Sequence, residues 1–477
     1  MDEERVLMAT PLPRNEASFT LGEVAELTGG ALHGDASLEL CGVFTDSRRS
    51  QPAGLFVALR GERFDGHEYA ASVDAAALLV EEDLKGRPHV RVSNTLEALG
   101  ALGQAHRLKW GGTAVAITGS VGKTTTKAFV ESALRSQGLR VRASEGNLNN
   151  FIGVPMSLFT LNEEVDVAVI EAGTNAPGEI EALGAMILPE LAVITAVRTA
   201  HTEGLGSVDA VGVEKRNLLL TLGAGDSAVL PADDLQLSDA HFLAEGVIAD
   251  APFERIRFGE GGSVFVKTHD FALVDGRPVR RMELSAPGGD LMLDLRSVGF
   301  GAMRGAAAAV AVLNAEPIRA LRQADAIDTS ALRDAFEQIE STPGRMQLRG
   351  RKHLVIDDSY NASPASMEAA IDDAAALAAL VRRPLVLMLG PMGELGELSA
   401  EAHANVLKLA VASGGRSVLV ADEYVVLPTH EETGRVQKQS VEEAIAFELA
   451  EPSVVLVKAS RSARLERVAD ALSGGVA

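Results

Sequence analysis

A buried strand that runs directly into a glycine turn and a helix, Thr113–Lys127, sets the strongest limit on how this chain folds. Ala114–Ile117 is a short apolar run, typical of a parallel strand that is covered on both faces. This turn suits a nucleotide. Backbone N–H groups at the helix N-terminus and the ammonium of Lys123 can bind phosphate oxygens, and the hydroxyl of Thr124 can bind their Mg²⁺. The predicted phosphate-binding residues are Gly119, Ser120, Val121, Gly122, Lys123, Thr124 and Thr125.

This loop departs from the common G-x-x-x-x-G-K-[ST] pattern, because Ile117 stands in place of the first glycine. The alternative is a plain glycine turn with Lys123 in solvent. The order of strand, turn, lysine and hydroxyl favours a phosphate loop, but it does not say what is done with the nucleotide.

Composition limits the class of protein. At 477 residues the chain is too long for one hydrophobic core, and its net charge of −22 argues against a nucleic-acid partner. Cys41 is the only cysteine, which excludes an intrachain disulfide and a cysteine-rich metal site. No apolar run is long enough to span a membrane, and the first residues are acidic where a signal peptide is basic. We therefore expect a cytoplasmic enzyme that is a monomer.

Alternation of predicted strands and helices indicates an α/β protein of three domains. We expect a small α/β substrate domain, a central doubly wound parallel sheet with the phosphate loop and a β-rich appendage, and a Rossmann-like C-terminal domain. The appendage is predicted to include Arg255–Phe258. Linkers at Trp110-Gly111-Gly112 and Asn314-Ala315-Glu316-Pro317 place the domains at 1–110, 111–315 and 316–477.

Three residues are predicted on or near the rim that carries the phosphate loop. Glu171 ends the apolar run Val165–Ile170, where a Mg²⁺ ligand belongs, although a helix cap or a surface residue is the alternative. His201 follows another strand, yet a single histidine is usually structural or exposed. Lys215 lies in the predicted helix Ser207–Leu222, and by itself it is predicted to be solvated.

Two polar segments allow two interpretations each. Asp46-Ser47-Arg48 fits either a capped turn or a contact with a diphosphate and a sugar. Asn149 and Asn150 fit either a loop with strained backbone or amide contacts to sugar and peptide groups.

Taken together, the motifs resemble the Mur ligases of peptidoglycan synthesis. The runs GNLNN at 146–150 and DSYNA at 358–362 resemble the member of that family that uses D-alanyl-D-alanine. The resemblance extends over all three predicted domains. Its motifs are Asp46–Arg48, Phe64–His67, Thr118–Lys127, Gly146–Pro155, Glu171–Ile180, His201–Gly206, Gly344-Arg345, Asp358–Pro364, Met392–Gly396 and Lys458–Arg461.

The resemblance implies a reaction and a set of roles. ATP would phosphorylate the terminal carboxylate of UDP-N-acetylmuramoyl-tripeptide, and the amine of D-alanyl-D-alanine would attack the acyl phosphate. Two Mg²⁺ ions are implied, with Lys215 carbamylated by CO₂. The implied metal ligands are Thr124, Glu171, His201 and Lys215, and the implied catalytic residues are Lys123, His201, Lys215 and Arg345. Arg345 and Asp358 are implied as further contacts to the nucleotide. The implied substrate contacts are Asp46, Ser47, Arg48, Asn149, Asn150 and Asn361.

The chain also departs from the family. Gly301 and Gly305 replace a histidine and an adenine-reading asparagine, and Ala196 replaces another asparagine. Asn217 and Pro391 stand where acidic residues are usual. Two rival functions stay open: a ligase of the same fold with another acceptor, such as a folyl-polyglutamate or cyanophycin type, and a non-catalytic nucleotide-sugar-binding relative.

These departures predict relaxed selection of the nucleotide base with the chemistry intact. We expect the KM for GTP to lie close to the KM for ATP when both are measured under the same conditions. A low KM for ATP together with strict discrimination against GTP would contradict this prediction.

Overall fold

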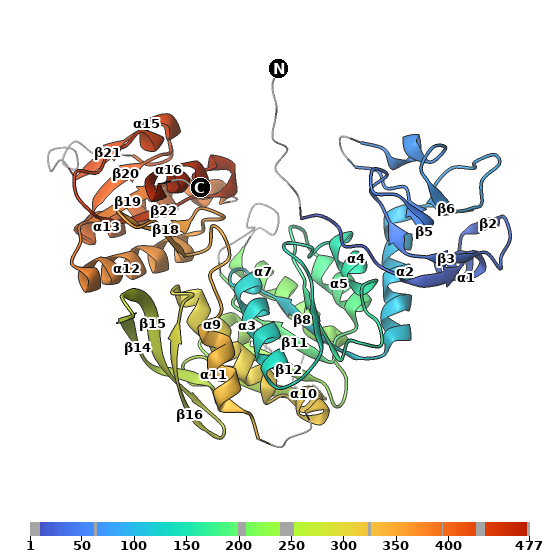
Figure 1. Cartoon of the computed structure of the whole chain (residues 1–477), viewed down its shortest axis with the longest axis horizontal. Coiled ribbons are helices and arrows are strands. Elements are labelled where there is room, and N and C mark those ends of the chain that lie inside the picture. Colours follow the sequence, from blue (N-terminus) through green and yellow to red (C-terminus); the bar gives the residue numbers. More distant parts are fainter. Residues whose placement is uncertain are drawn as a thin grey trace.

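The computed structural model describes residues 10–61, 64–198, 207–238, 252–322, 326–393, 395–425 and 435–474. Three sheet-based units lie in a row, with the N-terminal unit at one end and the C-terminal unit at the other (Figure 1). The predicted α/β class with three units is confirmed. Within the described ranges, no helix has the length and apolar character needed to cross a membrane.

The N-terminal unit is a mixed sheet of order β2-β7-β6-β5-β4, in which only β2 is antiparallel to its neighbour. Helix α2 leaves this unit from the N-cap Asn94, whose side chain accepts hydrogen bonds from Leu96 N and Glu97 N, and ends at Gly111 in the left-handed region. The elements of the N-terminal unit are β1 (Ser18–Thr20), α1 (Leu21–Thr28), β2 (Ala31–His33), β3 (Glu39–Cys41), β4 (Val43–Phe44), β5 (Gln51–Val57), η1 (Gly66–Tyr69), β6 (Ala75–Val80), β7 (His89–Arg91) and α2 (Thr95–Trp110).

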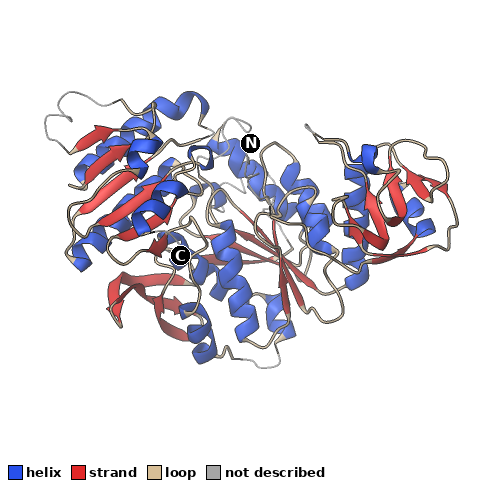
Figure 2. Cartoon of the chain, turned by 45° about the horizontal axis from the view of Figure 1, so that its top comes forward, coloured by secondary structure: helices blue, strands red, loops and turns tan. Residues whose placement is uncertain are grey.

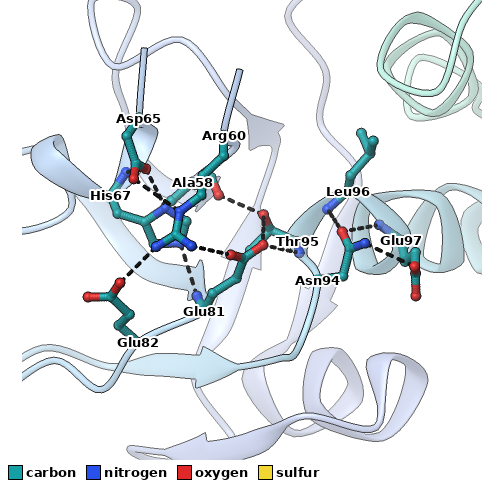
Figure 3. Close-up of polar contacts among 10 residues, drawn as sticks. All are labelled: Ala58, Arg60, Asp65, His67, Glu81, Glu82, Asn94, Thr95, Leu96 and Glu97. Atoms are coloured by element: carbon teal, nitrogen blue, oxygen red, sulfur yellow. Dashed lines mark hydrogen bonds and ion pairs between the residues drawn. The ribbon is translucent and has the colours of Figure 1, made fainter. Parts of the chain in front are cut away.

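A charged network ties the strand ends of this unit to the start of α2 (Figure 3). Arg60 Nε lies 3.0 Å from Asp65 Oδ2, and its terminal nitrogens reach Glu81 at 3.1 Å and Glu82 at 2.7 Å. Glu81 also accepts a hydrogen bond of 3.0 Å from Thr95 N, at the first residue of α2. The network therefore fixes where the helix that leads to the central unit begins.

The central unit is a parallel sheet of order β13-β12-β11-β8-β10-β9, with helices on both faces (Figure 2). Along β8, Val115 and Ile117 face one core, and Ala114 and Ala116 face the other, as expected for a strand covered twice. The elements are β8 (Thr113–Thr118), α3 (Lys123–Ser136), β9 (Val141–Ala143), α4 (Gly153–Leu158), β10 (Val167–Glu171), α5 (Glu179–Ile187), β11 (Leu191–Ile194), α7 (Val208–Arg216), η2 (Asn217–Thr221), β12 (Ser227–Pro231), η3 (Leu235–Leu237) and β13 (Glu254–Phe258).

An antiparallel sheet follows, made of β14 (Phe265–Val274), β15 (Arg277–Ala286) and β16 (Gly289–Leu295). It confirms a β-rich appendage, but the assignment of Arg255–Phe258 to it was wrong. Those residues form most of β13, which pairs in parallel with β12 at the edge of the central sheet. The apolar side chains Ile256 and Phe258 are buried in the central core, which holds β13 there. The Ala-rich helix α9 (Phe300–Leu313) packs on α3, as expected for small residues.

The C-terminal sheet has the order β17-β18-β22-β19-β20-β21, with β17 antiparallel and the rest parallel. This arrangement confirms a Rossmann-like sheet with an added edge strand. Its elements are β17 (Gln347–Arg349), β18 (Leu354–Asp358), α12 (Pro364–Val381), β19 (Leu385–Leu389), η4 (Gly396–Leu398), α13 (Ser399–Ala412), β20 (Arg416–Leu419), β21 (Val436–Lys438), α15 (Val441–Ile445), β22 (Val454–Lys458), η5 (Arg461–Ala463) and α16 (Glu466–Ser473).

The packing of two helices bears on the second domain boundary, which was predicted at residue 316. Helices α10 (Glu316–Leu321) and α11 (Thr329–Glu337) bury Ile318, Leu332 and Phe336 in the central core. The ring of Phe336 meets that of Phe129 of α3 edge-on, with centroids 5.1 Å apart. We therefore propose that the central domain extends to about residue 337 and that the C-terminal domain begins after it.

A buried ion pair joins the appendage to the C-terminal unit. Arg280 of β15 pairs with Asp373 of α12, and its Nε donates to Val298 O at 2.9 Å. Asp373 also accepts from Phe300 N at 3.1 Å, and the guanidinium lies 3.7 Å from the centroid of the Phe271 ring. Both charged side chains are almost fully buried, so each depends on the other.

Removing one partner of this pair should destabilise the protein. We expect Arg280→Met to lower the free energy of unfolding by about 3–5 kcal/mol, because it leaves the Asp373 carboxylate buried without its cation. Urea unfolding measures the change. Arg281→Met is the matched control, since Arg281 pairs with Asp294 in solvent and its loss should leave the midpoint unchanged. Equal midpoints for the two variants would contradict the prediction.

Candidate active site between the central and C-terminal sheets

A cavity of about 450 Å³ lies between the central unit and the C-terminal unit. Its walls come from the phosphate loop, the strand ends after β10 and β11, the start of α9, the segment before β17 and the segment after β18. Most of the residues predicted to bind the nucleotide line this one cavity. They are Ser120, Val121, Gly122, Lys123, Thr124, Thr125, Arg345 and Asp358, together with Glu171, Asn149 and Asn361.

The phosphate loop has the predicted order of strand, turn and helix. Gly119 and Gly122 have φ of 144° and 84°, values that favour glycine. A Cβ added at Gly119 would lie 2.0 Å from Thr195 Oγ1, so no other residue fits there. Lys123 is the first residue of α3, and its Nζ donates to Gly119 O at 2.7 Å. The turn is therefore held closed around backbone N–H groups at a helix start, which suits phosphate oxygens.

Glu171 is buried at the carboxyl end of β10, in register with Ile117 of β8. Thr124 Oγ1 donates to its Oε2 at 3.0 Å, and Asn149 Nδ2 donates to its Oε1 at 2.9 Å. A carboxylate and a hydroxyl so placed, beside a phosphate loop, suit Mg²⁺. The geometry favours the metal-ligand interpretation of Glu171 over a surface role.

Lys127, one helical turn beyond Lys123, is a site residue that sequence reasoning missed. Its Nζ donates to Ser144 O at 2.5 Å and to Gly146 O at 3.0 Å, and lies 3.6 Å from Glu171 Oε2. Burial lowers the pKa of Lys127, and the nearby charge of Glu171 opposes that shift. Its spacing of four residues from Lys123 on one helix face was the available signal.

Lys215 is fully buried, so the prediction of a solvated lysine was wrong. Helix α7 ends at Arg216, well before the predicted Leu222, and continues as η2. Burial, and then the charge of Lys123, lower the pKa of Lys215 well below its usual range. Its Nζ has no hydrogen-bond partner among the residues that the structure describes. His201, predicted to act beside it, lies outside the described residues.

The C-terminal unit contributes charged groups to the same cavity. The Arg345 guanidinium stacks on the Tyr360 ring at 4.2 Å. Asp358 pairs with Lys458, and the Lys458 ammonium also donates to Asn361 O at 3.0 Å. Lys458 was quoted only as part of a motif, and its position at the end of β22 was the available signal.

The remaining predicted substrate residues lie elsewhere. Asn150 caps a turn through bonds from Ile152 N and Gly153 N and is absent from the cavity lining. In the N-terminal unit, Asp46 accepts hydrogen bonds from the main chain and the guanidinium of Arg48. The capped-turn interpretation of Asp46-Ser47-Arg48 therefore describes its local structure.

Packing explains one of the two glycines near α9 that depart from the family pattern, Gly305. A Cβ added at Gly305 would lie 3.1 Å from the ring of Phe129 and 3.4 Å from Thr126 Cα, so a larger residue would push α9 away from α3. Gly301, by contrast, faces open space in the cavity wall. Arg304 makes two hydrogen bonds to Asp233, of 2.6 and 3.0 Å.

Comparison with known proteins agrees with this geometry. Residues 117–267 match the Mur ligase middle domain, and residues 344–461 match the Mur ligase, glutamate ligase domain. The UDP-N-acetylmuramoyl-tripeptide--D-alanyl-D-alanine ligase of Escherichia coli strain K12 is 33% identical over 467 residues, which cover 95% of this chain and 98% of the relative. The chain belongs to the Mur ligase family.

Solved structures of Mur ligases share the whole arrangement. A crystal structure of MurF from Acinetobacter baumannii aligns with a TM-score of 0.83 at 27% identity, covering 96% of this chain and 100% of that one. MurF ligase from Thermotoga maritima in complex with ADP aligns with a TM-score of 0.74 at 26% identity, covering 91% and 97%. The Mur ligase resemblance of the sequence motifs is thereby confirmed.

Proposed function

We propose that this protein is an ATP-dependent ligase that joins D-alanyl-D-alanine to UDP-N-acetylmuramoyl-tripeptide and releases ADP and phosphate. One observation carries the proposal: Lys123 and Glu171 of the central unit line the same cavity as Arg345 and Lys458 of the C-terminal unit. The Escherichia coli relative named UDP-N-acetylmuramoyl-tripeptide--D-alanyl-D-alanine ligase is similar over nearly the whole chain, which supports D-alanyl-D-alanine as the acceptor.

The proposed reaction has two steps. An oxygen of the tripeptide's terminal carboxylate attacks the γ-phosphorus of ATP, the bond to ADP breaks, and an acyl phosphate forms. The amine of D-alanyl-D-alanine then attacks the carbonyl carbon, loses a proton, and displaces phosphate. Positioning and charge stabilisation supply most of the catalysis in such transfers. Here the 119–122 amides and Lys123 bind phosphate oxygens, and Arg345 offsets the charge on the transferring group.

Thr124 and Glu171 would hold one Mg²⁺, because both present oxygens to one point at the mouth of the phosphate loop. Mg²⁺, when bound, neutralises phosphate charge there. Asn149 and Lys127 hold the Glu171 carboxylate in place. His201 and Lys215 remain our proposed ligands for a second ion.

Lys215 fits a carbamate. Burial and the nearby charge of Lys123 lower the pKa of Lys215, which favours the neutral amine, and only a neutral amine adds CO₂. The addition forms an N–C bond, releases one proton and leaves an anionic carboxylate. This change converts a group that is repelled by Lys123 into one that suits a metal ion.

The other predicted contacts belong to the same proposal. Asp358 contacts the ribose, and Asn149, Asn150 and Asn361 contact the tripeptide or the dipeptide. Asp46, Ser47 and Arg48 hold the UDP-sugar; the Arg48 guanidinium pairs with Asp46 and is exposed to solvent. The protein acts as a cytoplasmic monomer on small-molecule substrates. The rival acceptor types are disfavoured, because relatives from Escherichia coli and Bacillus subtilis both carry the D-alanyl-D-alanine name.

Phosphate release in the presence of ATP, Mg²⁺, UDP-N-acetylmuramoyl-tripeptide and D-alanyl-D-alanine tests the function. We expect release only with both substrates and a loss on the order of a thousandfold in kcat for Arg345→Ala, because the transferring phosphoryl loses its cation. Arg351→Ala, an exposed arginine six residues on, is the control. No release by the wild-type protein would favour the non-catalytic binding protein.

Removing CO₂ should lower activity, and bicarbonate should restore it, if Lys215 acts as a carbamate. The part of the activity that depends on CO₂ should shrink as pH falls, because protonation of the amine competes with CO₂ for the same lone pair. In CO₂-free buffer, Lys215→Met should also raise stability at neutral pH. The lowered folded-state pKa makes protonation favour the unfolded chain, so this difference should shrink as pH rises toward the ordinary value of 10.5.

Carbon-13 NMR of protein equilibrated with labelled bicarbonate gives the direct measurement. A carbamate signal in the wild-type protein that is absent from Lys215→Met supports the assignment. Equal spectra, with activity indifferent to CO₂, would contradict it while leaving the ligase reaction standing.

A further inference from the structure

Two histidines and an aspartate meet in the N-terminal unit, and none of them lines the active-site cavity. One of the histidines is on β2, which lies at the outer end of that unit (Figure 1). The antiparallel register of β2 and β7 sets His33 directly opposite His89. Their rings stack with centroids 4.4 Å apart and planes within 2°. Asp83, in the turn between β6 and β7, brings its Oδ1 to 3.3 Å from His33 Nε2 and 4.0 Å from His89 Nε2.

The ring of His89 is fixed in the orientation that metal binding needs. Its Nδ1 lies 2.9 Å from Arg87 O, so that nitrogen carries the proton and donates. The lone pair is therefore on Nε2, which points toward Asp83 and accepts only a long bond of 3.3 Å from Leu84 N. A backbone carbonyl behind the ring is the usual partner of a metal-bound histidine.

The other two groups are accessible and adjustable. His33 and Asp83 keep 43% and 62% of their side chains exposed, whereas His89 is almost fully buried. One ligand atom from each of the three residues lies within 4.8 Å of the other two. Zinc needs contacts of about 2.0–2.2 Å along each lone pair, and an imidazole lone pair lies in the plane of its ring. The exposed His33 ring would therefore have to turn out of the stack, and Asp83 to rotate, for one ion to reach all three residues.

A neighbouring arginine already pairs with Asp83. Arg91 Nε lies 3.1 Å from the same Asp83 oxygen and balances the carboxylate when no metal is bound. A bound cation would compete with Arg91 for that oxygen, and Arg91 would have to move to the other carboxylate oxygen.

We propose that His33, Asp83 and His89 form a binding site for a late first-row divalent cation, with Zn²⁺ as the best match. Two imidazoles and one carboxylate suit Zn²⁺, whereas Mg²⁺ prefers oxygen ligands alone. The cation would join the edge strand β2 to the β6–β7 turn. Because β2 is the edge strand of the described sheet and is paired with β7, this link would stabilise the outer edge of the sheet.

The experiment uses the full chain, freed of metal and kept in excess Mg²⁺ so that the proposed magnesium ligands are occupied. Titration with Zn²⁺ gives the stoichiometry and affinity, and Co²⁺ in its place gives a visible spectrum that reports nitrogen ligands. We expect one Zn²⁺ per chain and a higher unfolding temperature. His33→Ala and Asp83→Asn should each weaken binding on the order of tenfold to a hundredfold.

Both variants alter exposed side chains, so folding is preserved, and His89 is left untouched because it is buried. His269→Ala, which removes an exposed histidine on β14, is the matched control and should bind Zn²⁺ like the wild type. Glu171→Gln should also leave this binding unchanged, which separates the site from the active site. Equal Zn²⁺ affinity in wild type, His33→Ala and Asp83→Asn, or a Co²⁺ spectrum without nitrogen ligands, would overturn the proposal.

Discussion

A buried carboxylate, Glu171, is the group around which the active site is arranged. Its side chain is 3% exposed, and a charge in that position needs compensation. The hydroxyl of Thr124, the amide of Asn149 and the ammonium of Lys127 supply it, and they come from α3 and from the loop before α4. The phosphate loop, the start of α3 and the GNLNN loop are thus tied to one point at the end of β10.

The position of that point follows from the sheet. In a parallel sheet the carboxyl ends of neighbouring strands share one edge, and ligands bind in the crevice beyond it. β8 lies between β10 and β11, so Lys123, Glu171 and the segment after Thr195 converge there. The second half of the site comes from the C-terminal sheet. The buried ion pair of Arg280 and Asp373 holds the C-terminal unit against the appendage of the central unit.

Local patterns predicted the parts of this arrangement that depend on short stretches of chain. The phosphate loop could be predicted because its turn needs glycine at φ above zero and a lysine at the start of a helix. Glu171 could be predicted because it ends an apolar strand. Spacing from Lys123 and the end of a strand pointed to Lys127 and Lys458, but no sequence pattern showed that these two lysines are buried. Asp46-Ser47-Arg48 left two interpretations, since a turn and an anion site use the same residues.

The sequence by itself determined the α/β class, the three units, the phosphate loop and the family, because these rest on periodicity and on turn chemistry within a few residues. Only the tertiary structure decided that Lys215 is buried, that β13 joins the central sheet, and that α10 and α11 pack on the central core. It also decided that Arg345 shares a cavity with Lys123. Each of these depends on contacts between segments far apart in the chain, and burial of a charge or an apolar face is set by what packs against it.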